Sequence, residues 1–259
     1  MKKKRRVLLI GGSGNLGSTI RKLDYFKNLD SPSEDDMNLH DRPSITKYLK
    51  NDYQLIINCA AKARMKECEE NPSEAIKTNI FGTMNLVKEI MNYTKKTKKK
   101  IKIIHISTDC VYPSTKGNYS ENDPLKPYNV YCWTKLCSES IIRLLENHIV
   151  IRTNFFNKEK IRFDTAATDV FTSKFEIQNL VKEIKNLSLT DFIGIVNVGK
   201  ERDSDFNNIK KFMPTLKPCK REDINKNLSL EFVKDSSMNL SLLKKIKIKY
   251  KKIYDRDFD

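Results

Sequence analysis

The sequence predicts an α/β protein with a Rossmann-type, doubly wound parallel sheet and a small, reduced C-terminal lobe. Two observations carry this prediction. Short apolar segments alternate with helical segments along the first 153 residues, and a glycine-rich segment directly follows the first apolar one. Such alternation is typical of a parallel sheet wrapped by helices. We therefore assign residues 1–153 to a Rossmann domain and residues 154–259 to a smaller lobe that partly interleaves with the sheet.

The elements follow one another at the spacing of strand–helix units. The expected strands are Arg6–Ile10, Gln54–Cys59, Ile101–Ser107, His148–Thr153 and Gly194–Val198. The expected helices are Asn15–Lys27, Ser44–Lys50, Pro72–Tyr93, Tyr128–Glu146, Phe175–Leu187 and Phe206–Phe212. The pattern becomes irregular after Thr153, and this change places the boundary of the second lobe.

Composition restricts the class of protein. A chain of 259 residues with 39% hydrophobic and 32% charged residues is expected to fold around a substantial core. No apolar run approaches the roughly 18–20 residues that a membrane span needs. The basic residues Lys2–Arg6 precede an apolar run, Val7–Ile10, that is too short for a signal peptide. We expect a soluble cytoplasmic protein without a membrane partner.

The net charge of +16 raises the question of nucleic-acid binding. The lysines are spread along most of the chain, with local runs at Lys2–Arg6, Lys95–Lys100 and Lys244–Lys252, and no aromatic residues alternate with them to form a stacking surface. A solvated basic surface is therefore favoured over a nucleic-acid site. A positive field would also attract an anionic, nucleotide-linked substrate.

The six cysteines contain no CxxC pair and no metal-type Cys/His spacing. We interpret them as reduced thiols and expect no metal site.

Three short motifs carry the chemistry. The first is Gly11-Gly12-Ser13-Gly14-Asn15-Leu16-Gly17, a G-x-x-G-x-x-G between the first strand and the first helix. Glycines there let the backbone approach a pyrophosphate, whose charge the amides at a helix N-terminus can meet. This position favours dinucleotide binding over a plain tight turn.

The second motif is Ser107-Thr108-Asp109, at the end of a buried strand. Ligands of open α/β sheets bind outside the carboxyl ends of the strands, so these side chains are expected to face a crevice. Capping of the following turn explains the motif equally well.

The third motif is Tyr131-Cys132-Trp133-Thr134-Lys135. The i, i+4 spacing places Tyr131 and Lys135 on one helical face. A phenol has an ordinary pKa near 10, and a neighbouring ammonium group lowers that pKa towards neutral pH. A single Tyr–Lys pair is weak evidence, but its position soon after Ser107-Thr108-Asp109 makes it much stronger.

With these motifs in register, the chain resembles the extended short-chain dehydrogenase/reductases, and most closely the dTDP-4-dehydrorhamnose reductase-like sugar-nucleotide reductases. The resemblance covers roughly residues 6–200. Further matching segments are Met37–Asp41, Ile57–Ala61 with Cys68, Glu69 and Asn79, Ser107–Pro113, Glu121–Pro127, Arg152–Phe156 and Gly194–Gly199.

The resemblance implies roles for individual residues. It implies a reductase that uses NADP(H) or NAD(H) on the 4-keto-6-deoxy sugar of a nucleotide diphosphate. Tyr131 would donate a proton to the keto oxygen, Thr108 would hydrogen-bond that oxygen, and Lys135 would bind the cofactor ribose and lower the pKa of Tyr131. Substrate binding would fall to Thr108, Asp109, Cys110 and Phe155. The implied cofactor-binding residues are Gly11, Ser13, Gly14, Asn15, Leu16, Asn38, Leu39, Ala60, Ala61, Lys62, Asn79, Ile106, Tyr131 and Lys135.

Several departures from the family pattern leave alternatives open. The acidic stretch Ser31–Asp36 stands where a basic residue usually meets the adenosine 2′-phosphate, which favours NAD(H). Lys62 replaces the usual His. Cys110 coincides with an acid–base cysteine of related epimerase/reductases, so a bifunctional 3,5-epimerase/4-reductase is an alternative if its pKa is lowered.

The lobe after Thr153 lacks much of a helix between Phe156 and Phe171. A non-catalytic regulatory subunit, as in methionine adenosyltransferase, is therefore a further alternative, although Thr108, Tyr131 and Lys135 argue against it. A homodimer is also possible.

Overall fold

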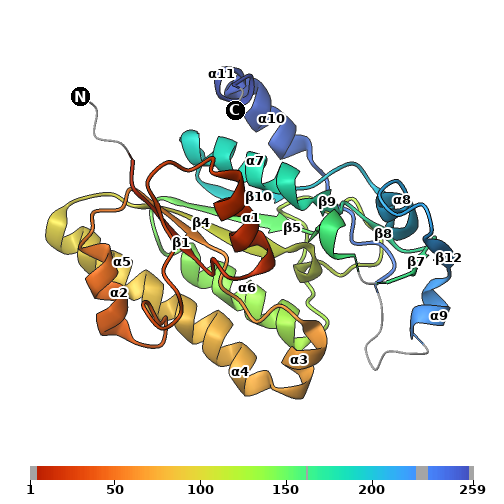
Figure 1. Ribbon diagram of the computed structural model, residues 1–259, viewed down its shortest axis with the longest axis horizontal. Coiled ribbons are helices and arrows are strands. Elements are labelled where there is room, and N and C mark those ends of the chain that lie inside the picture. Colours follow the sequence, from red (N-terminus) through yellow and green to blue (C-terminus); the bar gives the residue numbers. More distant parts are fainter. Residues whose placement is uncertain (1–4, 162, 226–232, 257–259) are drawn as a thin grey trace.

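The computed structural model describes residues 5–161, 163–225 and 233–256. Lys2–Lys4 of the first basic run and the acidic end of the chain after Arg256 lie outside these residues. The described chain is built on a six-stranded parallel sheet in the order β10-β5-β4-β3-β1-β2 (Figure 1). Its strands are β1 Val7–Ile10, β2 Leu29–Asp30, β3 Leu55–Asn58, β4 Lys102–Thr108, β5 His148–Thr153 and β10 Gly194–Val198. The predicted Rossmann-type α/β fold is confirmed.

Helices cover both faces of this sheet (Figure 1). On one face lie α1 Asn15–Leu23, α7 Ile177–Leu189 and α10 Ser241–Lys249. On the other lie α2 Arg42–Leu49, α5 Thr83–Thr97 and α6 Val130–Ile142. Successive residues of a strand point to opposite faces, so Ile104 of β4 packs in the first layer and Ile103 in the second. Both faces of the strands are therefore buried, and most of their middle residues are apolar on both faces rather than alternating in polarity.

The remaining elements are short. The helical ones are α3 Met65–Glu70, α4 Pro72–Ile76, η1 Lys77–Gly82, η2 Asp109–Val111, η3 Lys158–Lys160, α8 Asp205–Lys210, α9 Arg221–Asn225 and α11 Lys251–Tyr254. The strands pair in twos: β6 Phe155–Phe156 with β9 Phe175–Glu176, β7 Thr165–Ala167 with β12 Lys217–Cys219, and β8 Phe171–Thr172 with β11 Asp203–Ser204. The lobe has a small apolar cluster of its own around Ala166, Ile209 and Leu216.

The second lobe and the sheet share residues from both halves of the chain. Strand β10 pairs with β5 at the sheet edge, and α7 packs on the sheet core, although both follow residue 153. Between Phe156 and Phe171 the described residues hold only the single turn η3 and the three-residue strand β7. The lobe is short here, as its length in the sequence predicts.

Some element boundaries differ from the predicted ones. Helix α1 ends at Leu23 because Asp24 adopts a left-handed conformation, with φ of 48°. The long helix predicted over Pro72–Tyr93 is interrupted by the π-helical turn η1. Strand β2 has only two residues and was not predicted, since so short a strand has no periodicity.

The strand order places a crevice at one end of the sheet. From β1 the chain crosses to β2 on one side and then to β3 on the other. The loops after β1 and β3 therefore diverge at the carboxyl ends of these strands, and such switch points are where open α/β sheets bind ligands.

No helix among the described residues is long and apolar enough to cross a membrane. No disulfide joins the six cysteines. Within the described ranges, no group of His, Cys, Asp and Glu side chains is arranged to hold a metal ion.

Candidate functional site

The glycine-rich loop lies at the switch point and is held close to its neighbours. The N–H of Gly14 donates to the carbonyl of Gly11 at 3.2 Å, and Gly14 caps α1. Gly11 has a φ of 80°, and a Cβ added to it would lie 2.6 Å from the backbone N of Ala60. A Cβ at Gly17 would lie 2.2 Å from the Gly11 carbonyl oxygen. The loop is therefore packed directly against β3 and α1, as an amide cradle for a pyrophosphate requires.

A cavity of about 500 Å³ opens beside this loop. Eight of the residues predicted to bind the cofactor line it: Gly11, Ser13, Gly14, Asn38, Leu39, Ala60, Ala61 and Lys62. They come from the loops after β1, β2 and β3. The sequence shows the order of these loops along the chain but not that they meet around one cavity. The fold thus gathers most of the predicted cofactor residues around one space.

Six predicted cofactor residues do not line this cavity: Asn15, Leu16, Asn79, Ile106, Tyr131 and Lys135. Leu16 and Ile106 pack in the core between the sheet and α1. Asn79 binds the backbone N–H and carbonyl of Lys62 at 2.8 and 3.0 Å and donates to Thr134 Oγ1 at 2.8 Å. It therefore fixes the Lys62 loop against α6.

The residues that line the cavity include both acidic and basic side chains. Glu34 and Asp36 line it, as the sequence suggested, but so does Arg21 of α1. The Asp36 carboxylate accepts the Ser33 hydroxyl at 2.7 Å and the Ser33 N–H at 3.3 Å. These hydrogen bonds lower the pKa of Asp36 and keep it charged. The sequence argument for NAD(H) counted the acidic residues and missed Arg21, which lies a helix away.

Thr108 and Tyr131 meet beyond the carboxyl end of β4. Thr108 is buried, and its Oγ1 accepts the N–H of Cys110 at 3.2 Å at the start of η2. Burial raises the pKa of Tyr131, as do the neighbouring thiols of Cys110 and Cys132, while the hydrogen bond with Thr108 opposes that rise. The phenol is therefore a neutral proton donor at physiological pH.

Lys135 lies one helical turn further along α6 and is 3% exposed. Burial lowers its pKa to about 8, against the opposing influence of Glu139 and Cys59. Its Nζ lies 3.2 Å from His105 Nε2. We expected Lys135 to lower the pKa of Tyr131. In the structure the pKa of Tyr131 is raised instead, because burial of the phenol outweighs any nearby cation.

Cys59 lies between the cavity of the glycine loop and Lys135 on α6. It lines the cavity of the glycine loop and lies close enough to Lys135 for each group to affect the pKa of the other. Lys135 on α6 thus lies near the cavity that most of the predicted cofactor residues surround.

This arrangement has counterparts among known proteins. The sequence pattern of the family described as RmlD substrate binding domain matches residues 5–176.

The chain belongs to this family.

Methionine adenosyltransferase 2 subunit beta of Rattus norvegicus is 30% identical over 189 residues, which is 68% of this chain and 54% of that protein. The chain thus spans about half the length of the curated relatives it matches. The dTDP-4-dehydrorhamnose reductase of Bacillus anthracis, solved in complex with NADP, superposes with a TM-score of 0.83 at 20% identity, covering 94% of this chain and 93% of that one. A hypothetical dTDP-4-dehydrorhamnose reductase of Sulfolobus tokodaii reaches a TM-score of 0.74 at 26% identity, covering 93% and 94%. The resemblance stated from the motifs is confirmed at the level of the family.

Asp109 of this RmlD-family chain is committed to contacts within the protein. Its Oδ2 accepts Asn154 Nδ2 at 2.9 Å and Ser236 Oγ at 2.7 Å, and the side chain is 1% exposed. Burial raises its pKa, although these hydrogen bonds oppose the rise. Asp109 was predicted to bind substrate; in the structure it ties the end of β4 to the end of β5 and to the C-terminal segment.

Cys110 is the residue on which the epimerase alternative depends. Its thiol is buried, and its pKa is raised well above the ordinary value by a hydrogen bond with Cys132, by burial and by the charge of Asp109. The hydroxyl of Tyr128 also contacts this thiol. The lowered pKa that an acid–base thiol requires is therefore absent, and the expectation of epimerisation through Cys110 loses its chemical basis.

Phe155, also predicted to bind substrate, belongs to β6 and packs partly buried against the core between the sheet and α7. Sequence reasoning missed His105 and Asn58, which lie beneath Lys135. It also missed Asn154 and Ser236. Only their positions at strand ends could have indicated Asn58 and Asn154, and nothing local marks Ser236.

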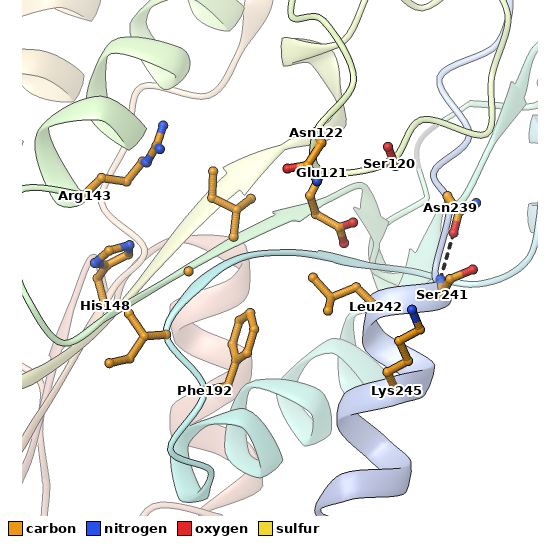
Figure 2. Close-up of a pocket in the computed structure, with 13 residues that line it drawn as sticks. Ser120, Glu121, Asn122, Arg143, His148, Phe192, Asn239, Ser241, Leu242 and Lys245 are labelled. Carbon is orange, nitrogen blue, oxygen red and sulfur yellow. Dashed lines mark hydrogen bonds between the residues drawn. The ribbon is translucent and has the colours of Figure 1, made fainter.

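A second cavity, of about 760 Å³, lies at the edge strand β10 (Figure 2). Arg143 and His148 stand on one side, and Leu242 and Lys245 of α10 on the other. Glu121 points between them and accepts the backbone N–H of Asn197 at 2.8 Å. This cavity contains none of the residues predicted for the site, so its size alone does not make it the candidate.

Proposed function

We propose that this RmlD-family chain is an NAD(P)H-dependent reductase of a nucleotide-linked 4-keto-6-deoxy sugar. The observation that carries the proposal is the position of Thr108, Tyr131 and Lys135 next to the cavity of the glycine loop, with Cys59 between them. The dTDP-4-dehydrorhamnose reductase of Bacillus anthracis, which shares the fold, binds NADP.

The glycine loop fits a dinucleotide. Side chains are excluded at Gly11 and Gly17, and the loop leads into the N-terminus of α1. The free amides and the helix dipole there favour a pyrophosphate. When bound, the nicotinamide would supply the hydride.

Tyr131 would provide the proton. A phenol whose pKa is raised stays protonated at neutral pH and can donate to an oxygen on which negative charge develops. Thr108 lies within hydrogen-bonding reach of Tyr131 and would orient it. Its hydroxyl donates to Asp109 Oδ1 at 3.2 Å, so it would have to turn its single hydrogen to the keto oxygen to act there as a second donor. Lys135 would hold the ribose and contribute positive charge beneath it.

The cofactor can be either nicotinamide dinucleotide. Arg21 provides a cation for a 2′-phosphate in the same cavity whose lining includes Glu34 and Asp36, which would repel one. We therefore propose that both NADP(H) and NAD(H) bind, with Arg21 favouring NADP(H).

The test is turnover by Tyr131→Phe. Loss of a general acid costs about 10²–10⁴-fold in rate, so kcat with a 4-keto-6-deoxy sugar nucleotide is expected to fall at least ~100-fold. NADPH affinity should change by less than about threefold, because the ring remains. Tyr48→Phe, on α2 outside the site, is the matched control. Undiminished turnover in Tyr131→Phe would contradict the proposal, as would failure of the wild-type protein to oxidise NADPH or NADH with any such sugar.

A second candidate function is a non-catalytic subunit of another enzyme. It is favoured by the relatives named methionine adenosyltransferase 2 subunit beta and by the short second lobe. Such a subunit would bind a nicotinamide dinucleotide without consuming it. The same turnover assay separates the two functions.

We also propose that the chain forms a homodimer through the outward faces of α5 and α6. These helices pack against each other and leave Met84, Met91 and Trp133 exposed. Phe81 in η1, just before α5, and Leu144, just after α6, are exposed as well. Exposed apolar groups gathered on neighbouring helices are typical of protein interfaces.

A further inference from the structure

His105 lies directly beneath Lys135 and belongs to none of the three motifs that predict the site. It projects from β4 towards α6 and is fully buried. Its Nε2 lies 3.0 Å from Ser138 Oγ and 3.2 Å from Lys135 Nζ. Its Nδ1 lies 3.2 Å from Asn58 Nδ2. Which ring nitrogen carries the hydrogen therefore decides what the imidazole offers to Lys135.

Asn58 determines which nitrogen of His105 carries the hydrogen, because a hydrogen bond with the backbone of Ala60 fixes the orientation of its amide group. Its Oδ1 accepts the N–H of Ala60 at 3.1 Å, so this oxygen faces away from His105 and the amide NH₂ faces the ring. An NH₂ group can only donate, so His105 Nδ1 must accept and carries no hydrogen. The ring hydrogen then sits on Nε2.

Ser138 is arranged to receive that hydrogen. Its hydroxyl donates to the carbonyl of Lys135 at 2.7 Å, which leaves the oxygen lone pairs directed to His105 Nε2. Hydrogen bonds thus run in one direction, from Ala60 through Asn58, His105 and Ser138 to a backbone carbonyl. Neither an amide nor a carbonyl exchanges protons near neutral pH, so the chain orients groups and does not relay protons.

Lys135 is left without an acceptor on this side. An Nε2 that carries a hydrogen cannot accept one from the ammonium group, and Lys135 has no other hydrogen-bond or ion-pair partner among the described residues. We propose that Asn58 fixes His105 as the Nε2–H tautomer, and that His105 is thereby a positioning residue that faces Lys135 with a donor and leaves the ligand to supply acceptors for its ammonium group. This rests on the proposed function, in which the ligand is the ribose of a nicotinamide dinucleotide.

The charges around Lys135 agree with this arrangement. His105 on β4 stays neutral, because burial and the charge of Lys135 lower its pKa well below the ordinary value. Cys59, after β3, stays a thiol, since burial raises its pKa to about 12. Glu139 on α6 is paired with Arg152 of β5 at 2.7 Å, so its charge is largely taken up there. The dinucleotide would therefore bring the acceptors that stabilise the charged form of Lys135.

When the solution pH lies above the pKa of Lys135 in the ligand-free protein, which is about 8, NADH binding should be accompanied by uptake of one proton by Lys135. Below that pH the ammonium is present in both states, so the Kd for NADH should be constant. Above it, the Kd should rise by up to about tenfold per pH unit, the limit for one linked proton. His105→Gln can turn a carbonyl towards Lys135, which would raise its pKa and move the break in the profile to higher pH.

The deciding experiment is long-range ¹H–¹⁵N NMR of the imidazoles in the ligand-free protein, with NADH binding followed by fluorescence across pH 7–10. The chain has three histidines, and His148→Gln, whose side chain lies in the second cavity (Figure 2), serves as assignment aid and control. We expect His105 to be protonated on Nε2 alone at neutral pH. We expect the plot of Kd against pH to bend near pH 8 in the wild type and in His148→Gln, and at a higher pH in His105→Gln.

A His105 protonated on Nδ1, or on both nitrogens, would overturn the proposal, and so would a Kd that does not change between pH 7 and 10. The NMR measurement of the tautomer is made on the ligand-free wild-type protein and needs no cofactor; His148→Gln serves only to assign its signals. If the wild-type protein bound no dinucleotide, the proposed function would be contradicted, but the NMR spectrum would still show which tautomer His105 adopts.

Discussion

Lys135 shows at the scale of one residue how strongly the interior changes side-chain chemistry. It is 3% exposed, and burial lowers its pKa from 10.5 to about 8. Tyr131, one turn away, is shifted in the opposite direction by the same cause. Desolvation disfavours the charged form of each group. The phenol is thereby kept neutral and the amine close to neutral pH in its titration, and the desolvation of both groups costs stability.

Lys135→Met is therefore expected to stabilise the fold at pH 7. Below pH 8 the wild-type lysine is charged in the folded and the unfolded state, so its full desolvation cost is present; above pH 10.5 it is neutral in both and the cost is gone. The gain in free energy of unfolding should approach ~3 kcal/mol at pH 7, from 1.36 kcal/mol per pKa unit, and should shrink as pH rises from 8 to 10.5. Urea denaturation measures it. Lys88→Met, exposed on α5, should change little; a destabilised or pH-independent Lys135→Met would contradict this account.

Arg21 gives a second prediction at this scale. Loss of a charge-assisted hydrogen bond to a 2′-phosphate costs about 1.5–3 kcal/mol, so Arg21→Ala should weaken NADPH binding at least ~10-fold. NADH affinity should stay within about twofold, because NADH lacks that phosphate. Titration with both cofactors compares them. An equal loss for NADH and NADPH would show that Arg21 acts on the loop and not on the phosphate.

At the scale of the element, helix α6 organises the reactive groups. Its N-cap is Asn129, whose side chain accepts the N–H of Cys132 at 2.8 Å. From that start the helical repeat presents Tyr131, Lys135 and Ser138 towards the end of β4. The neighbouring Glu139 binds Arg152 and Ser107, which ties the helix to β5 and β4. Helix α6 is thus fixed to the sheet along the same face that carries the site.

Asn129→Ala should affect both stability and turnover. Removing an N-cap costs about 1 kcal/mol, and fraying of the first turn would displace Tyr131 two residues later. We expect a fall in Tm together with a several-fold fall in kcat. Asn157→Ala, which removes the cap of the surface turn η3, should leave kcat unchanged. A normal kcat in Asn129→Ala would show that packing alone holds Tyr131.

At the scale of the whole molecule, the two sides of the sheet differ in their exposed surface. The α5–α6 side carries Phe81, Met84 and Trp133, with exposures of 51%, 45% and 54%. Burial of such side chains is worth roughly 25 cal/mol per Å² of apolar surface, before the entropic cost of association. This side is therefore the candidate for self-association.

The homodimer prediction is tested by sedimentation. The double substitution Met84→Glu and Trp133→Glu should convert a dimer to a monomer, because four carboxylates, two from each protomer, would be buried in the interface. Ile248→Glu, at 77% exposure on α10 and on the opposite side of the sheet, is the control and should remain dimeric. A monomeric wild-type protein would disprove the interface.

Much of this architecture was predictable because the signals are local. Strands β5 and β10 match the predicted ranges residue for residue. The glycine spacing identified the loop, and the i, i+4 spacing placed Tyr131 and Lys135 on one helix. Each of these inferences needs only the periodicity or the backbone freedom of neighbouring residues.

Other features depend on contacts between distant segments. Asp109 could not be recognised as structural from its own motif, since one of its partners, Ser236, lies 127 positions away. Arg21 enters the cavity wall only because α1 packs beside the loop after β2. The net upward shift of the Tyr131 pKa could not be foreseen for a similar reason: the sequence shows which groups are near, but not how much water they lose. That Lys135 lowers this pKa stays a prediction.

Short-range geometry makes three features predictable without the structure: the α/β fold, the glycine loop, and the position of Tyr131 and Lys135 on one helical face. The tertiary structure decided the charge states of the site, the commitment of Asp109 to internal contacts and the orientation of His105 beneath Lys135. Burial and hydrogen-bond direction are properties of the assembled interior, where groups from β3, β4 and α6 compete for the same donors and acceptors.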